Sequence, residues 1–173
     1  MQRQNGFRSV MFLASDRQSC AYLRAIGSCK PLQGVAAFKN QARCTTLTPE
    51  MLNERLTEIA KEMNGLTALV LALSDESGDS TSAIAALERT ALREAAKRRV
   101  RCAVLVSTLN QANFLKSLDR DVPPWIQLGF TPTHTVKGAI APLLPRPPFC
   151  NVRVVDDFMS GASTIAHEIG QFA

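Results

Sequence analysis

The sequence has few of the residues that build metal centres and aromatic stacking surfaces. Its 173 residues include two histidines, one tryptophan and one tyrosine, and its five cysteines contain no C-x-x-C pair. Zinc sites usually combine closely spaced cysteine and histidine ligands, so we expect no metal and no cofactor. An odd number of cysteines without such spacing favours reduced thiols, which indicates a cytoplasmic protein.

Long apolar runs are also absent. No stretch reaches the roughly 18 consecutive apolar residues that a membrane-spanning helix requires, so we expect no membrane partner. A hydrophobic content of 46% is nevertheless too high for a disordered chain. The length fits one domain, and we therefore expect a single globular domain over residues 1–173.

Positive charge is concentrated at the N-terminus. Residues 1–43 hold seven basic residues and one acid, whereas residues 44–173 hold 13 basic and 14 acidic residues. The net charge of +5 therefore comes from the first quarter of the chain. Because organelle transit peptides are basic and poor in acids, organelle targeting is the alternative to a cytoplasmic location.

Apolar runs and helical patterns alternate along the chain. Uninterrupted apolar runs predict strands that are covered on both faces, and helical spacing predicts the segments between them. The expected strands are 8–14, 35–38, 66–73, 101–107 and 152–155. The expected helices are 16–27, 48–63, 84–95, 108–118 and 158–169. This order predicts a three-layer α/β domain, flavodoxin-like or Rossmann-like, with an open parallel sheet and helices on both faces.

The segment 122–149 interrupts this alternation, because it holds seven of the nine prolines. Proline is excluded from helix interiors and from central strands, so we expect an ordered excursion with one short strand, at 125–130 or at 135–141. Ordered prolines and exposed aromatic side chains lose little entropy on binding. We therefore expect a partner surface formed by Trp125, Phe130 and Phe149.

A motif near the C-terminus is similar to a sugar-phosphate loop. Residues 154–164, VVDDFMSGAST, follow the pattern of an apolar strand, two acids, two apolar residues and a small polar loop. This pattern resembles the phosphoribosyl-pyrophosphate signature of type I phosphoribosyltransferases. The resemblance implies that Asp156 and Asp157 hold the ribose hydroxyls, with magnesium as a companion ion. It implies a 5′-phosphate site at Ser160, Gly161, Ser163 and Thr164.

Polar residues after successive strands resemble the receiver domain of response regulators. The resemblance implies that Asp16 is the metal-binding acid, Asp75 the phosphoacceptor and Thr108 the switch hydroxyl, with Arg146 in the place of the family's lysine. Only one acid follows the first strand, and arginine does not supply the compact ammonium group of lysine. The resemblance therefore implies a degenerate receiver that binds partners without phosphotransfer.

A third similarity involves Ser15, the dipeptide Asp79-Ser80 and Glu88. This arrangement resembles that of nucleoside deoxyribosyltransferases, in which a glutamate after an Asp-Ser loop is catalytic. The resemblance implies a catalytic role for Glu88. The position of Glu88 beside Arg89 on the predicted helix 84–95 instead predicts a side chain that faces solvent.

Basic residues crowd the end of the same helix. This basic patch comprises Arg93, Lys97, Arg98 and Arg99. Such a patch would contact nucleic-acid phosphates. With one tryptophan and one tyrosine in the chain no stacking surface is visible, so we expect a solvated helix end rather than a nucleic-acid site.

These observations lead to one functional prediction and two alternatives. We expect a non-catalytic regulatory or protein-interaction module, receiver-like but without a complete phosphoacceptor site, that binds another protein or a second copy of the chain. The first alternative is a phosphoribosyl- or nucleotide-binding protein or enzyme that uses residues 156–164. The second is a nucleic-acid-binding protein that uses the basic patch.

Overall fold

A computed structural model describes residues 10–14, 17–29, 68–118, 126–132, 151–158 and 160–172. They form a five-stranded sheet in which every strand is parallel to its neighbours. The strands are β1 (Val10–Leu13), β2 (Ala68–Ala72), β3 (Arg101–Leu105), β4 (Ile126–Pro132) and β5 (Asn151–Val155), and they lie in this order across the sheet. The parallel sheet predicted from the alternation of apolar runs and helices is confirmed.

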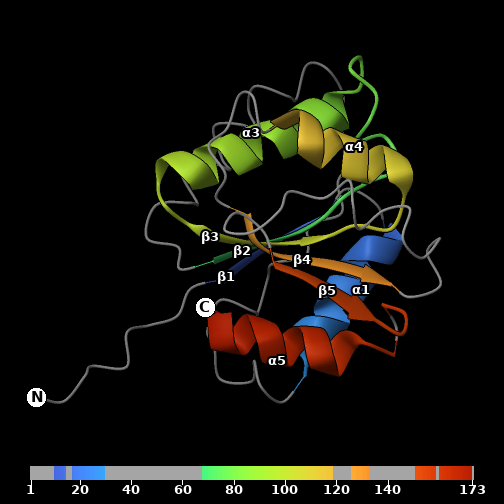
Figure 1. Cartoon of the computed structure of the whole chain (residues 1–173), viewed down its shortest axis with the longest axis vertical. Coiled ribbons are helices and arrows are strands. Elements are labelled where there is room, and N and C mark those ends of the chain that lie inside the picture. The colour runs from blue at the N-terminus through green and yellow to red at the C-terminus, as the bar shows by residue number, and fades with distance from the viewer. Residues whose placement is uncertain are drawn as a thin grey trace, which may run out of the picture.

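Helices of the described ranges cover both faces of the sheet (Figure 1). Helices α3 (Ala83–Lys97) and α4 (Leu109–Leu118) lie on one face, and α1 (Arg17–Gly27) and α5 (Ala162–Phe172) lie side by side on the other. Ser82 begins α3 by accepting hydrogen bonds from the N–H groups of Ile84 and Ala85. The three-layer α/β arrangement is therefore confirmed. The predicted strand 35–38 and helix 48–63 lie outside the described residues.

Successive strand residues point to opposite faces, which divides the core into two clusters. Leu69 and Leu71 of β2 pack with α3 and α4, whereas Val70 and Ala72 pack with α1 and α5. Strand β3 alternates in the same way and is buried after its first residue. This double burial explains why both strands are apolar at nearly every position.

Strand β4 corresponds to the first of the two positions predicted for a strand in the proline-rich segment. It lies between β3 and β5, and Phe130 is fully buried against α1 and α5. The prediction that Phe130 forms part of an exposed partner surface is therefore wrong, because an internal strand buries both of its faces. Trp125, Phe149 and the segment 135–141 lie outside the described residues.

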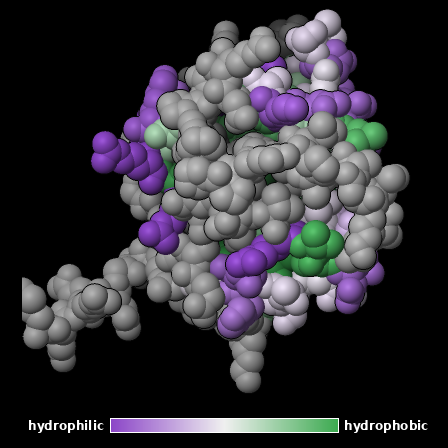
Figure 2. All heavy atoms as spheres, viewed as in Figure 1, coloured by the Kyte–Doolittle hydropathy of each residue, from purple (hydrophilic) through white to green (hydrophobic). Residues whose placement is uncertain are grey.

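Among the described residues, the large hydrophobic side chains that are exposed are Leu109 and Val154. On the side shown in Figure 2, hydrophilic residues predominate where described residues reach the surface, and hydrophobic residues form only small areas. None of the helices in the described ranges is long and apolar enough to cross a membrane.

Candidate functional site at the carboxyl edge of the sheet

The carboxyl edge is the edge of the sheet at which the parallel strands end. Its described segments are residues 73–82 after β2, 106–108 after β3, and 156–158 with 160–161 after β5. Ligands of open parallel sheets bind at this edge, especially where neighbouring strands continue into helices on opposite faces. Strands β1 and β2 meet this condition, because α1 and α3 lie on opposite faces.

Glu88 is the main chemical feature of this edge. It lies in the N-terminal half of α3 and is only 1% exposed, so the prediction of a solvent-facing side chain is wrong. The reason is helical spacing, since Glu88 is three residues after Ala85 and four before Leu92, both of which are buried. These three residues share one face of the helix, and that face is turned toward the sheet.

The loop after β2 surrounds the Glu88 carboxyl group. The Ser74 N–H donates to Oε2 over 3.1 Å, and the Ser74 hydroxyl donates to Oε1 over 2.9 Å. The Ser77 Oγ lies 2.9 Å from Oε1 and 3.0 Å from Oε2. Both serines are buried, so each of these contacts is shielded from water. The carboxyl group therefore fixes the path of the chain where β2 ends.

Burial raises the pKa of Glu88 to about 7. The hydrogen bonds from Ser74 and Ser77 act to lower this pKa, and the nearby Glu76 carboxylate raises it by a smaller amount. The hydrogen-bond geometry agrees with a neutral carboxyl group. Ser77 Oγ also lies 2.8 Å from the Ser74 carbonyl oxygen, and its single hydrogen cannot serve all three acceptors. A proton on Glu88 can be donated to Ser77 Oγ, which leaves the Ser77 hydrogen for the Ser74 carbonyl.

Gln111 of α4 joins the ends of β2 and β3. Its side chain is 2% exposed, and its Nε2 donates to the Leu73 and Ser74 carbonyl oxygens, each over 3.1 Å. Its Oε1 accepts from the Ser107 N–H over 2.7 Å and from the Ser107 hydroxyl over 3.2 Å. Glu88 therefore binds the N–H and hydroxyl of Ser74, and Gln111 binds its carbonyl oxygen. Together they fix the backbone where β2 ends.

The receiver-like residues are only partly described. Asp75 is exposed just beyond β2, next to Ser74. Thr108 begins α4, where its hydroxyl accepts a hydrogen bond from the Gln111 N–H over 3.2 Å. The Thr108 hydroxyl thus acts as a helix cap in this structure. Asp16 and Arg146 lie outside the described residues.

Residues 156–158 and 160–161 lie in a tight turn between β5 and α5. The Asp157 carboxylate accepts from the Ser160 N–H over 2.7 Å, and the Asp157 carbonyl accepts from the Gly161 N–H over 2.8 Å. The resemblance to phosphoribosyltransferases implies that the N–H groups of Ser160 and Gly161 bind a phosphate. In this structure both groups donate to Asp157 instead. Asp156, Ser163 and Thr164 are exposed around it.

Tyr22 of α1 lies beside this turn. Its ring centroid is 5.7 Å from that of Phe158, and its buried hydroxyl has no hydrogen-bond partner within the described part of the chain. Burial raises the pKa of Tyr22, and the charge of Asp157 raises it further. The phenol is therefore a neutral donor.

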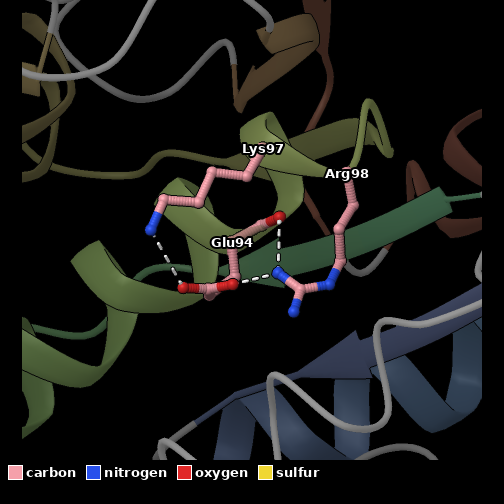
Figure 3. A network of polar contacts seen from close by, with 3 residues as sticks. All are labelled: Glu94, Lys97 and Arg98. Atoms are coloured by element: carbon pink, nitrogen blue, oxygen red, sulfur yellow. Dashed lines mark hydrogen bonds and ion pairs between the residues drawn. The ribbon is translucent and has the colours of Figure 1, made fainter.

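The basic patch lies at the opposite edge of the sheet, the amino edge, where the strands begin and α3 ends. Glu94 binds two of its members: Lys97 Nζ is 3.5 Å from Glu94 Oε1, and Arg98 forms an ion pair with Oε2 (Figure 3). Partial burial acts to raise the pKa of Glu94, but Arg98 and Lys97 outweigh it and lower the pKa. Arg99 is exposed and has a φ of 54°, a left-handed conformation.

Possible metal ligands do not cluster in the described ranges, where no three histidine, cysteine or acidic side chains gather. Cys29 and Cys102 are free thiols, and burial raises the pKa of Cys102.

Comparisons with models of protein families, with curated proteins and with solved structures find no match to this chain. The carboxyl edge must therefore be interpreted from its own chemistry.

Proposed function

We propose that Glu88 is the reacting carboxyl group of an enzyme that cleaves or transfers the bond between a pentose and a nucleobase. One observation carries the proposal: Glu88, which is buried and has a pKa near 7, lies at the carboxyl edge of the sheet. It lies where the neighbouring strands β1 and β2 continue into helices on opposite faces. Buried acids with strongly shifted pKa values at such edges are candidates for catalysis. The resemblance of Asp79-Ser80 and Glu88 to nucleoside deoxyribosyltransferases supports this choice of substrate.

The ionised form of Glu88 supplies the nucleophile. One Glu88 oxygen forms a bond to C1′ of the nucleoside while the C1′–N bond breaks. The electron pair of the C1′–N bond stays on the base, and the base takes a proton from water. A nitrogen of a second base, or water, then attacks C1′ of the glycosyl ester, loses a proton to solvent and restores the carboxylate. The Ser74 N–H and hydroxyl orient the group, and the Ser77 hydroxyl must give up its contact with Glu88 to admit the sugar.

The test is base exchange between a 2′-deoxynucleoside and a second free base, with hydrolysis followed in parallel. The wild-type rate should rise with pH around a midpoint near 7, because only the ionised carboxyl attacks. Glu88→Gln keeps the size and most hydrogen bonds of the side chain, and we expect it to lose about 10³-fold or more in rate. A folded wild type without activity, or a Glu88→Gln protein that retains it, would overturn the proposal.

The second candidate is the non-catalytic regulatory or protein-interaction module. It is favoured by the use of Glu88, Gln111, Thr108 and Asp157 as caps and loop clamps, which is what a rigid binding scaffold needs. Thermal unfolding with 2′-deoxynucleosides, phosphoribosyl pyrophosphate, nucleotides and magnesium separates the candidates. A scaffold should show no shift with any of them. Stabilisation that Asp156→Ala removes would instead support the phosphoribosyl-binding alternative, because Asp156 is exposed beside the turn.

A further inference from the structure

Hydrogen-bond donors outnumber the lone pairs at the Ser74 carbonyl oxygen. The Ser77 Oγ lies 2.8 Å from this oxygen, the Gln111 Nε2 lies 3.1 Å from it, and the Ser77 N–H donates to it over 3.3 Å. A carbonyl oxygen has two lone pairs, so it accepts well from two of these three donors. The Ser77 Oγ is also within hydrogen-bond distance of both Glu88 oxygens. Its single hydrogen therefore points either to the carboxyl group or to the carbonyl.

The Gln111 side chain is held with its amide nitrogen toward this carbonyl. Its Oε1 accepts from the Ser107 N–H and hydroxyl, and its Nε2 donates to the Leu73 and Ser74 carbonyl oxygens. These four hydrogen bonds use both hydrogens and both lone pairs of the amide group. The reversed amide would place its oxygen against two carbonyl oxygens, so only one orientation satisfies the site. None of the four bonds involves Glu88, and Gln111 can affect that carboxyl group only through other residues.

We propose that Gln111 is a positioning residue for Glu88, because it satisfies the carbonyl that otherwise binds the Ser77 hydroxyl. With the Gln111 Nε2 and the Ser77 N–H on its two lone pairs, the carbonyl does not require the hydroxyl hydrogen. That hydrogen then turns to the carboxylate and stabilises its ionised form. Without Gln111 the buried carbonyl lacks a donor, and the hydroxyl hydrogen turns back to it. The effect on the reaction rests on the proposed function, whereas the effect on ionisation does not.

Charged groups around Glu88 do not supply this effect. In the described part of the chain, the charged residues of the loop after β2, of the turns of α3 next to Glu88, of β3 and of α4 are Asp75, Glu76, Asp79, Arg89, Arg101 and Lys116. Of these, Glu76 slightly raises the pKa of Glu88. The Arg89 guanidinium lies over the Phe114 ring, 5.7 Å from its centroid. Replacing Gln111 by an uncharged residue changes none of these charges, so its effect on ionisation reports the hydrogen bonds.

Titration of the Glu88 carboxyl group by carbon-13 NMR tests the proposal. Gln111→Met keeps the length of the side chain and removes its four hydrogen bonds, so the titration midpoint should rise by roughly one pH unit, the effect of losing one hydrogen bond to a charged group. In a Ser77→Ala background the same substitution should leave the midpoint unchanged, because no hydroxyl remains to turn. Leu118→Ala is the matched control, since it removes a buried side chain from the other end of α4. It should lower stability without moving the midpoint.

The wild type offers a second measurement, which decides the question if Gln111→Met does not fold. The Gln111 side-chain N–H shares the Ser74 carbonyl with the Ser77 hydroxyl. Its proton NMR signal should therefore titrate with the same midpoint as Glu88, and Ser77→Ala should abolish this response. A Gln111 signal that stays constant while Glu88 titrates would contradict the proposal.

Two further results would overturn the proposal. One is a midpoint that Gln111→Met leaves unchanged, or raises equally with and without the Ser77 hydroxyl. The other is an equal rise in Leu118→Ala, which would trace the effect to lost stability. The pH midpoint of base exchange should follow the NMR midpoint in each variant. A folded wild type without base exchange would refute the proposed function, and the titrations would still decide whether Gln111 positions Glu88.

Discussion

The two edges of the sheet use their polar residues in opposite ways. At the carboxyl edge, Glu88 and Gln111 are almost completely buried and fix the loop after β2. At the amino edge, Lys97, Arg99 and Arg101 are exposed, and the ion pairs of Glu94 are only partly buried. Buried polar groups are costly to leave without partners, whereas exposed ion pairs contribute little to stability. We therefore expect substitutions at the carboxyl edge to change stability far more than substitutions at the amino edge.

The largest expected effect is that of Glu88→Ala. It removes the acceptor of the buried Ser74 N–H and hydroxyl and leaves a cavity, so the free energy of unfolding should fall by about 3 kcal/mol. Glu88→Gln, which keeps one acceptor oxygen, should lose less than half as much. Urea unfolding near pH 6 measures both. Equal stability of wild type and Glu88→Ala would show that the hydrogen bonds of Glu88 do not stabilise the carboxyl edge.

The pH dependence of stability isolates the charge of Glu88. Its pKa is about 7 in the folded protein, against an ordinary value of 4.5. Because the folded-state pKa is the higher one, the stabilisation by the neutral group is complete below pH 4.5 and is lost as the pH rises through 7. The unfolding free energy should decrease across this window by an amount on the order of 3 kcal/mol. Glu88→Gln should remove most of this slope, and a slope that persists in the variant would have to arise from other groups.

Gly161→Ala tests the close packing of the turn after β5. A Cβ atom at this position would lie 2.6 Å from the Asp157 carbonyl oxygen and 2.8 Å from the Val155 Cβ, so the backbone must move. We expect a loss of about 2 kcal/mol in unfolding free energy. Gly78→Ala is the matched control, because its nearest neighbour, the Asn110 Cβ, would be 3.4 Å away. If both variants unfold at the same urea concentration, the turn tolerates the displacement.

The smallest expected effect lies at the amino edge. Arg99→Gly relieves the left-handed conformation and should raise the unfolding free energy by at most about 1 kcal/mol, since the freer unfolded chain offsets part of the gain. Arg99→Ala removes the same charge but keeps the strain, and thermal unfolding should show no comparable gain. A destabilised Arg99→Gly protein would mean that the Arg99 side chain makes a contact that supports the fold.

The sequence predicted the layers well because β2 and β3 are apolar at nearly every position and α3 has a clear buried stripe. The same stripe could have located Glu88, which falls between Ala85 and Leu92 on the helix face. The adjacent arginine suggested solvent exposure instead, because charge is a stronger local signal than position on a helix. Burial of an acid becomes predictable only when the partners that satisfy it are known.

The polar groups that meet at the end of β2 are distant in sequence or come from a different helix. Ser74 precedes Glu88 by 14 residues, and the Gln111 side chain reaches the Leu73 carbonyl 38 residues away. No local pattern links such groups, and the contact of Gln111 with Leu73 depends in addition on the parallel pairing of β2 with β3. The burial of Phe130 was also missed. It is buried because β4 lies between β3 and β5, and the many prolines around β4 argued against an internal strand.

The most direct test of the account is the pKa of Glu88 itself, measured by carbon-13 NMR of its side-chain carboxyl group, with Glu88→Gln used to assign the signal. We predict a titration midpoint near 7, accompanied by a change in the Ser74 amide signal over the same range. A midpoint near the ordinary value of 4.5, with an unchanged Ser74 amide, would contradict both the buried network and the chemistry proposed for it.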